Sequence, residues 1–356
     1  MQYRDKVMTN DEWEKAITAA LDETTLDLSK EDLTELHPAI KKLCNLKGLH
    51  LDDNKLTGLP SEIGNLTNLT MLDLGRNQLM GLPSEIGNLT ELNVLFLWKN
   101  QLTALPSEIG HLTKLNKLYI GWNQLTALPP KLGYLTNLRQ LYAVENKLKN
   151  LPSELGKLTR LERFGISSNQ LTSLFPEIGQ LRKLVELSIG NNLLTVLPPE
   201  IAQLTQLTQL FAPENQLAAL PPEIGYLINL TKLDLSKNQL ATLPHEIGHL
   251  SKLTKLDLSG NQLTTLPPEI GKLKNLTKLD ISGNQLTALP PEIAKLTNLD
   301  VLNLRENPLS ALPPELEKMR KETEIEIEFS GNLTESPEKP AKSSGFLGGL
   351  GKMFGK

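Results

Sequence analysis

One asparagine recurs every 23 residues along most of this 356-residue chain. The positions that share the spacing are Asn54, Asn77, Asn100, Asn123, Asn146, Asn169, Asn192, Asn215, Asn238, Asn261, Asn284 and Asn307. A fixed period of this length is typical of repeat proteins, in which small units stack and bury a continuous core that no unit could bury alone. We therefore expect one elongated body rather than the two or three domains that the length alone would suggest.

The first half of each repeat predicts a short strand and a turn. In the segment LTKLDLSGN, Leu256 and Leu258 alternate with polar residues, so one face of the strand is apolar and the other is polar. The segment ends at Asn261, whose side chain can both donate and accept hydrogen bonds to backbone groups inside the turn. One such group left unpaired would cost about 1–3 kcal/mol, which explains why the asparagine recurs.

The second half of each repeat predicts a short helical turn. In the segment LTTLPPEIGKL, Pro267 and Pro268 precede Glu269, and both prolines and carboxylates favour the start of a helix. These return segments are bulkier than strands, which stack roughly 4.8 Å apart, so the stack must bend. We expect an α/β solenoid: a horseshoe with a parallel β-sheet on the concave face and short helical or 3₁₀ turns on the convex face.

The repeats LxxLxLxxNxL and LPxEIGxL, as in Leu276 to Leu296, strongly resemble typical 23-residue bacterial and intracellular leucine-rich repeats. This class includes the repeat domains of Roco proteins and of the Ras-group-related repeat proteins. The resemblance covers about residues 23–330 and implies protein–protein recognition through the concave face, without enzymatic activity. Roco proteins also carry a GTPase domain, but this chain contains no GxxxxGK[ST] phosphate-binding loop, so nucleotide hydrolysis is not expected.

The domain organisation follows from where the repeat stops. We expect an N-terminal helical cap over residues 1–22, the solenoid with its C-terminal capping strand over 23–330, a linker over 331–344, and a Gly-rich amphipathic tail over 345–356. The tail places apolar residues at helical spacing beside two lysines, which predicts either weak contact with a membrane or a partner or a disordered end.

Both ends of the solenoid require caps, because a terminal repeat has no neighbour on one side. Asp11 is expected to cap a helix whose apolar face, which includes Trp13, covers the first strand. Ile325 and Ile327 fall one period after Leu302 and Leu304, which predicts a closing strand in the same register.

Composition and charge limit the class of protein. The chain has 37 basic and 41 acidic residues, and this balance argues against a nucleic-acid binder. We find neither a signal peptide nor a run of 18 apolar residues, and the single cysteine, Cys44, can form no internal disulfide. These features predict a cytoplasmic protein, and we expect a monomer.

One segment matches a catalytic motif. His245 to His249 (HEIGH) fits the zinc-peptidase pattern HExxH, which needs a helix with both histidines on one face and a third ligand. The repeat dictates the residues between the histidines, and Pro244 and Gly248 indicate a single short turn. A zinc hydrolase is therefore a remote alternative, and we expect no catalytic residue, no cofactor and no metal site.

The polar-face residue between the two strand leucines changes character along the stack. We call this the central concave position; its occupants are Asp27, His50, Asp73, Phe96, Tyr119, Tyr142, Gly165, Ser188, Phe211, Asp234, Asp257, Asp280, Asn303 and Glu326. The flanks are polar and the middle is aromatic. Trp98 points to the same side as Phe96, and Trp122 lies at the adjoining turn. Strand alternation places these rings in solvent, and exposed aromatic clusters usually mark interaction sites.

Gly165 and Ser188 predict a shallow depression between Tyr142 and Phe211, about 14 Å across three strand steps. Polar partners are expected on its rim. The residues predicted to contact a partner are Phe96, Trp98, Tyr119, Trp122, Arg139, Tyr142, Glu145 and Phe211. We interpret the chain as a non-catalytic protein-binding module or signalling adaptor. An alternative is an effector secreted without a leader that binds host proteins through the same face.

Overall fold

The computed structural model describes residues 9–329, which form one curved solenoid. Fourteen three-residue strands pair in chain order as a single parallel sheet. The strands are β1 (Thr25–Asp27), β2 (Gly48–His50), β3 (Met71–Asp73), β4 (Val94–Phe96), β5 (Lys117–Tyr119), β6 (Gln140–Tyr142), β7 (Arg163–Gly165), β8 (Glu186–Ser188), β9 (Gln209–Phe211), β10 (Lys232–Asp234), β11 (Lys255–Asp257), β12 (Lys278–Asp280), β13 (Val301–Asn303) and β14 (Glu326–Glu328).

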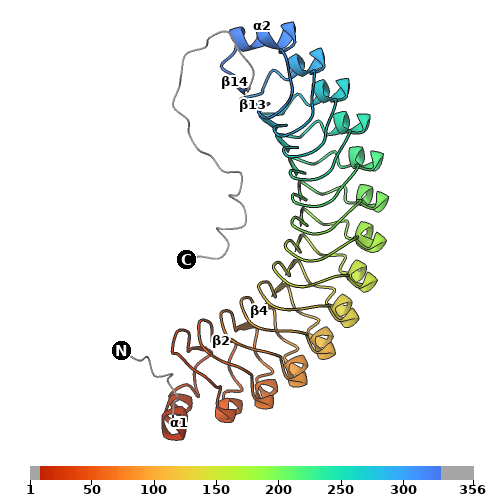
Figure 1. Ribbon diagram of the computed structural model, residues 1–356. Helices are drawn as coiled ribbons and strands as arrows, with labels where there is room; N and C mark the ends of the chain where they lie inside the picture. Colours follow the sequence, from red (N-terminus) through yellow and green to blue (C-terminus); the bar gives the residue numbers. More distant parts are fainter. Residues whose placement is uncertain (1–8, 330–356) are drawn as a thin grey trace.

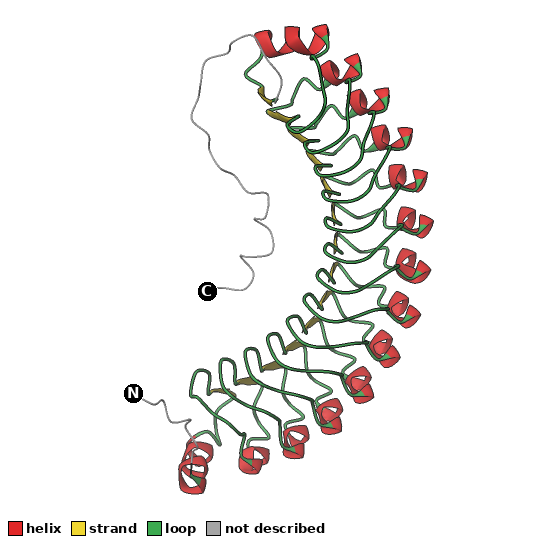
Figure 2. Cartoon of the chain, in the orientation of Figure 1, coloured by secondary structure: helices red, strands yellow, loops and turns green. Residues whose placement is uncertain are grey.

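Each strand from β1 to β13 is followed by a return segment that contains a short helix, and one further helix precedes β1. The helices are α1 (Asn10–Ala19), η1 (Pro38–Lys42), η2 (Ser61–Asn65), η3 (Ser84–Asn88), η4 (Ser107–His111), η5 (Pro130–Tyr134), η6 (Ser153–Lys157), η7 (Pro176–Gln180), η8 (Pro199–Gln203), η9 (Pro222–Tyr226), η10 (His245–His249), η11 (Pro268–Lys272), η12 (Pro291–Lys295) and α2 (Pro314–Glu322), of which those labelled η are 3₁₀ helices. Figure 1 and Figure 2 show the strands on the inner side of the curve and the helices on its outer side. The predicted fold class is confirmed.

The recurring asparagines tie each repeat to the one before it. Asn169 illustrates the pattern: its Oδ1 accepts from the Leu148 N–H at 3.0 Å, and its Nδ2 donates to the carbonyls of Ala143 and Ile166, both at 3.0 Å. These bonds satisfy backbone groups that the leucine core would otherwise leave unpaired. The sequence-based explanation for the asparagine period is therefore confirmed.

The residue just before each asparagine adopts a left-handed backbone, which turns the chain out of the strand. Gly260 and Gly283 occupy this slot in two repeats, whereas Trp122 and Glu145 occupy it with φ of 53° and 54°. Only glycine takes this conformation without steric cost.

The N-terminal cap differs from the prediction in its first residue. Helix α1 begins after Thr9, whose hydroxyl accepts from the Glu12 N–H, while the Glu12 carboxylate accepts from the Thr9 N–H. Asp11 lies in the first turn rather than at the cap, so the prediction for Asp11 was wrong: the Thr–x–x–Glu pair forms a reciprocal capping box. Trp13 and Ile17 are buried as expected and close this end of the core.

The register at the C-terminal end is two residues longer than predicted. Ile327, not Ile325, pairs with Leu302, and Glu328 rather than Glu326 continues the column after Asn303. The reason is that the nine-residue α-helix α2 replaces the five-residue 3₁₀ helix of the preceding repeats. The closing strand itself was predicted correctly.

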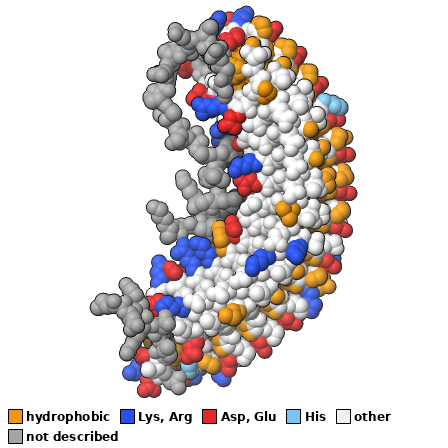
Figure 3. Space-filling model, viewed as in Figure 1, with side chains coloured by type: hydrophobic (Ala, Val, Ile, Leu, Met, Phe, Trp, Pro, Cys, Tyr) orange, Lys and Arg blue, Asp and Glu red, His pale blue; other side chains and the backbone are white. Residues whose placement is uncertain are grey.

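The predicted linker, 331–344, and the predicted tail, 345–356, lie outside the described residues. Within residues 9–329, no helix has both the length and the apolar character needed to cross a membrane. On the face seen in Figure 3, acidic and basic side chains are interspersed rather than gathered into a field of one sign.

Candidate functional site

Three rings form a continuous row along the middle of the concave wall. The parallel register places Phe96, Tyr119 and Tyr142 side by side on β4, β5 and β6. The Phe96 and Tyr119 ring centroids are 5.0 Å apart with planes tilted by 59°, and those of Tyr119 and Tyr142 are 5.1 Å apart with planes within 23°. These geometries are favourable for aromatic pairs. We call this set the ring row.

Two members of the ring row are buried, which the sequence did not predict. Tyr142 is 2% exposed and Tyr119 is 7% exposed. A Cβ atom built on Gly165 would lie 2.5 Å from Cδ1 of Tyr142, so this ring occupies the space over β7 that a side chain would otherwise fill. The predicted depression at Gly165 is therefore taken up by Tyr142, and the expected exposure of Tyr119 and Tyr142 was wrong.

Burial changes the chemistry of the two phenols. It raises the pKa of Tyr142 to about 12, and the charge of nearby Glu186 acts in the same direction. Tyr119 donates its hydroxyl to Oε1 of Gln140, so this phenol has a partner within the wall. Both tyrosines are thus neutral, fixed side chains that support the exposed part of the wall.

A second row, made of indoles and cations, lies where the strands end. Trp98 and Trp122 are both partly exposed. The Arg76 guanidinium carbon lies 5.0 Å from the Trp98 ring centroid, and the Lys99 Nζ lies 5.6 Å from Trp98 and 6.0 Å from Trp122. Each distance is within the range of a cation–π interaction. We call Arg76, Trp98, Lys99 and Trp122 the indole–cation row.

The backbone explains how the indole–cation row is assembled. Arg76, Lys99 and Trp122 all occupy the left-handed slot before a recurring asparagine, with φ of 53–54°. Trp98 comes from the residue before that slot and packs on Gly75, where a Cβ atom would lie 2.5 Å from its Nε1. Our sequence analysis did not include Arg76 or Lys99 among the predicted contact residues. Aligning the slot before each asparagine would have revealed both cations beside the two tryptophans.

The remaining predicted contact residues do not join either row. Arg139 forms an ion pair with Glu162, and Glu145 is exposed in a left-handed turn with φ of 54°. Phe211 is partly exposed on β9, separated from β6 by two strands, and within residues 9–329 it makes no ring contact. The structure therefore gathers five of the eight predicted residues into two adjoining rows and leaves three outside them.

The HExxH segment does not form a zinc-peptidase helix. His245 to His249 is the 3₁₀ helix η10, in which residues four apart point about 120° from each other. In an α-helix the same spacing would leave the two side chains about 40° apart, on one face. His245 instead contacts the neighbouring Glu246, with Nε2 and Oε1 3.1 Å apart. The short turn predicted from Pro244 and Gly248 is confirmed.

Comparison with known proteins identifies the family. A family model described as a leucine-rich repeat region matches residues 71–173 and 221–353, which together make up more than half of the chain. The chain is a leucine-rich-repeat protein. A second leucine-rich-repeat model matches residues 24–79 and 159–217. The narrower grouping with Roco-type repeats stays a prediction.

Several solved leucine-rich-repeat structures are similar to this one. A leucine-rich-repeat protein of Leptospira interrogans is 37% identical, with 91% of this chain and 93% of that chain covered and a TM-score of 0.73. An internalin of Listeria monocytogenes is 25% identical, with coverages of 93% and 91% and a TM-score of 0.74. The plant peptide hormone receptor RGFR1, in complex with RGF2, is 31% identical, with coverages of 87% and 55% and a TM-score of 0.73. Among curated proteins, no sequence matches.

Proposed function

We propose that this leucine-rich-repeat protein binds a protein or peptide on its concave face, and that the contact centres on Phe96 and the indole–cation row. The observation that carries the proposal is a group of partly exposed aromatic side chains fixed beside two cations on the inner wall. Tryptophan, tyrosine and arginine are the residues most enriched at interaction hot spots. The similar receptor RGFR1 was solved in a complex, which supports a binding role for the fold.

The packing of the row favours tight binding. Trp98 lies against Gly75, and Phe96 packs against the Tyr119 ring on the neighbouring strand. Side chains that are already fixed lose little conformational entropy on binding, so more of the contact energy appears as affinity. Tyr119 and Tyr142 act in this proposal as supports rather than as contact residues, because both are buried.

The charges indicate the kind of partner. Arg76 and Lys99 lie over the indole rings, so a partner segment that inserts an apolar side chain between them also meets positive charge. A segment that carries a carboxylate next to an apolar residue matches this surface. Arg139, Glu145 and Phe211 lie outside the two rows and form a polar and apolar margin of the proposed interface.

A selection experiment tests the proposal without a known partner. Peptides are selected from a random displayed library on the wild-type protein, and their affinities are measured for a Trp98→Ala/Trp122→Ala variant. Because the variant lacks two proposed hot-spot residues, its affinity for the selected peptides should be at least about tenfold weaker than that of the wild type. The matched control is Tyr134→Ala/Tyr226→Ala, which removes two aromatic residues that are 50% and 67% exposed on the convex helices η5 and η9.

The control variant should bind the peptides as the wild type does, and melting temperatures should show that both variants fold. Peptides that bind the tryptophan variant and the wild type equally would place the interface elsewhere. Peptides lost equally on both variants would argue against a concave site.

Three narrower expectations stay predictions. A cytoplasmic location and the alternative of leaderless secretion are distinguished by fractionating cells and medium. The monomeric state is measured by light scattering of the purified protein.

A further inference from the structure

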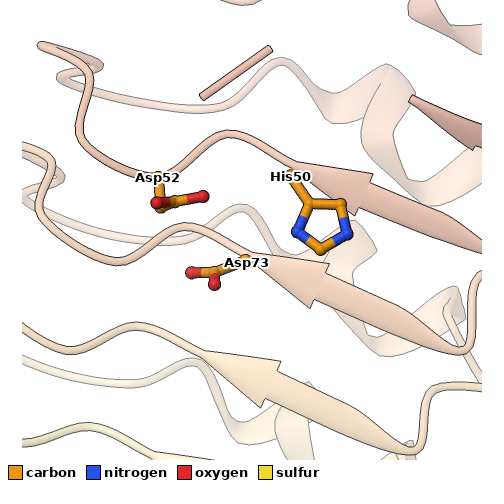
Figure 4. Close-up of side chains that lie close together, drawn as sticks. All are labelled: His50, Asp52 and Asp73. Atoms are coloured by element: carbon orange, nitrogen blue, oxygen red, sulfur yellow. The ribbon is translucent and has the colours of Figure 1, made fainter. Parts of the chain in front are cut away.

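His50, Asp52 and Asp73 converge at one point of the inner wall, and no sequence motif links them. His50 ends β2, Asp73 ends β3, and the parallel register pairs the two residues directly. Asp52 follows β2 by two residues. One ligand atom from each side chain lies within 4.8 Å of the others, and Figure 4 shows the imidazole beside both carboxylates. All three side chains are half-buried.

The side chains of this trio retain unused bonding capacity. Within residues 9–329, neither the His50 ring nor the Asp52 carboxylate takes part in a hydrogen bond or an ion pair. Asp73 accepts only one hydrogen bond, at Oδ1, from the Gly75 N–H at 2.9 Å. In later repeats the equivalent aspartate is more fully engaged: Asp257 accepts from both the N–H and the hydroxyl of Ser259.

The residue that distinguishes Asp73 is Gly75, because the other repeats with an aspartate at the central concave position all have serine there. Trp98 fills the space above Gly75, so a serine side chain cannot fit there. Among the described residues, the Asp73 carboxylate therefore accepts no hydrogen bond at Oδ2. Burial raises the pKa of Asp73 to about 6, and the charge of Asp52 adds to this effect. A cation bound between the two carboxylates would offset the repulsion between them.

The geometry points to a site for a divalent transition metal, with Zn²⁺ as the first candidate, held by His50, Asp52 and Asp73. One imidazole and two carboxylates are the ligand types that Zn²⁺ uses, whereas Mg²⁺ and Ca²⁺ prefer oxygen ligands alone. The charge of the dication balances the combined charge of the two carboxylates. Three protein ligands leave a fourth position of a tetrahedral site for water or for an anionic group.

The separations between the three side chains are close to those of a metal site. Ligand atoms in a tetrahedral zinc site lie about 3.3 Å apart, given metal–ligand bonds of 2.0–2.1 Å. The ligand atoms of His50, Asp52 and Asp73 lie at most 4.8 Å apart, so binding requires them to approach by at most about 1.5 Å. This site lies next to the proposed partner interface, since Asp73 pairs with Phe96 of the ring row, but the assignment does not rest on that interface.

The test is metal titration of the full chain, without an affinity tag. Zn²⁺ binding is measured by calorimetry, and Co²⁺ serves as a spectroscopic probe, because its visible absorption reports ligand number and type. We expect one site per chain. His50→Ala and Asp73→Asn should each weaken Zn²⁺ binding at least about tenfold and change the Co²⁺ spectrum.

Two controls match these substitutions. Asp257→Asn changes an aspartate of the same column that has no histidine beside it, and His245→Ala/His249→Ala removes the HExxH histidines; both should bind Zn²⁺ as the wild type does. Thermal melting in EDTA shows whether each variant folds. If a variant does not fold, Asp52→Asn takes its place, because the Asp52 carboxylate makes no hydrogen bond or ion pair within the described residues. The assignment would be overturned if Zn²⁺ did not bind stoichiometrically, or if binding survived the substitution of His50 and Asp73. Loss of binding on substitution of the HExxH histidines would also overturn it.

Discussion

Replacing Asp257 by asparagine should stabilise the folded protein at neutral pH. Asp257 is 7% exposed on β11, and the register places it between Asp234 on β10 and Asp280 on β12. Burial raises the pKa of Asp257 from 3.8 to about 6, and the two neighbouring aspartates act in the same direction. The carboxylate is therefore a buried charge next to like charges, and its ionisation costs free energy.

The magnitude follows from the pKa. A folded-state value of about 6 in place of 3.8 corresponds to about 3 kcal/mol at neutral pH. Asparagine can still accept the two bonds from Ser259, but a neutral acceptor bonds less strongly than a carboxylate. We therefore expect a net gain of about 1–2 kcal/mol in the free energy of unfolding.

The sign of the pH dependence is fixed by the direction of the shift. Because the folded-state pKa is above the unfolded one, the contribution of Asp257 to stability is fully present below about pH 4 and is lost as the pH rises through about 6. The advantage of the asparagine variant should therefore be largest above about pH 7 and small near pH 4. One repeat already shows the arrangement, since Asn303 takes the equivalent place and accepts from the Arg305 N–H.

The assay is urea unfolding of both proteins at about pH 4 and about pH 7.5, followed by circular dichroism and by tryptophan fluorescence. Asp300→Asn, at an exposed aspartate, is the control and should change stability little at either pH. The reasoning would be refuted if the Asp257 variant gained nothing at neutral pH, or if its gain were the same at both pH values.

Two further substitutions test the packing of the stack. Asn169→Ala should lower the free energy of unfolding by about 1–3 kcal/mol, because it leaves the Leu148 N–H without its partner and removes one of the two hydrogen bonds that the Ala143 and Ile166 carbonyls each accept from asparagine side chains; a loss below about 0.5 kcal/mol in urea unfolding would contradict this. Gly165→Ala should displace the Tyr142 ring and cost about 1–3 kcal/mol, since the added Cβ would lie 2.5 Å from the ring. An unchanged near-UV circular dichroism spectrum and melting temperature would show that the ring does not depend on that space.

Much of the fold could be read from local pattern. The period of 23 predicted a stack, alternation of leucine with polar residues predicted one buried strand face, and proline before glutamate predicted the short convex helices. These predictions succeed because each repeat contacts mainly its neighbours, so the whole fold is one local structure repeated along the chain. They fail at the ends, where Thr9 rather than Asp11 caps the first helix and α2 shifts the last register.

The candidate site could be predicted only in part. Alternation correctly put the aromatic side chains on the concave wall, but it could not show that Tyr142 lies over Gly165 and is buried there. Whether a side chain on a strand is exposed depends on the volume of the residue beside it on the next strand. That neighbouring residue lies 23 positions away in the sequence, so its volume cannot be read from the pattern within one strand.

The sequence by itself determined the architecture, because a short unit repeated many times has one way to stack its leucines and satisfy its asparagines. Only the tertiary structure decided which side chains meet. The pairing of β2 with β3 brings His50 to Asp73, and the left-handed slot brings Lys99 to Trp98 and Trp122. Both groupings arise from register between repeats, since parallel strands place residues that are distant in the chain within a few ångströms of one another.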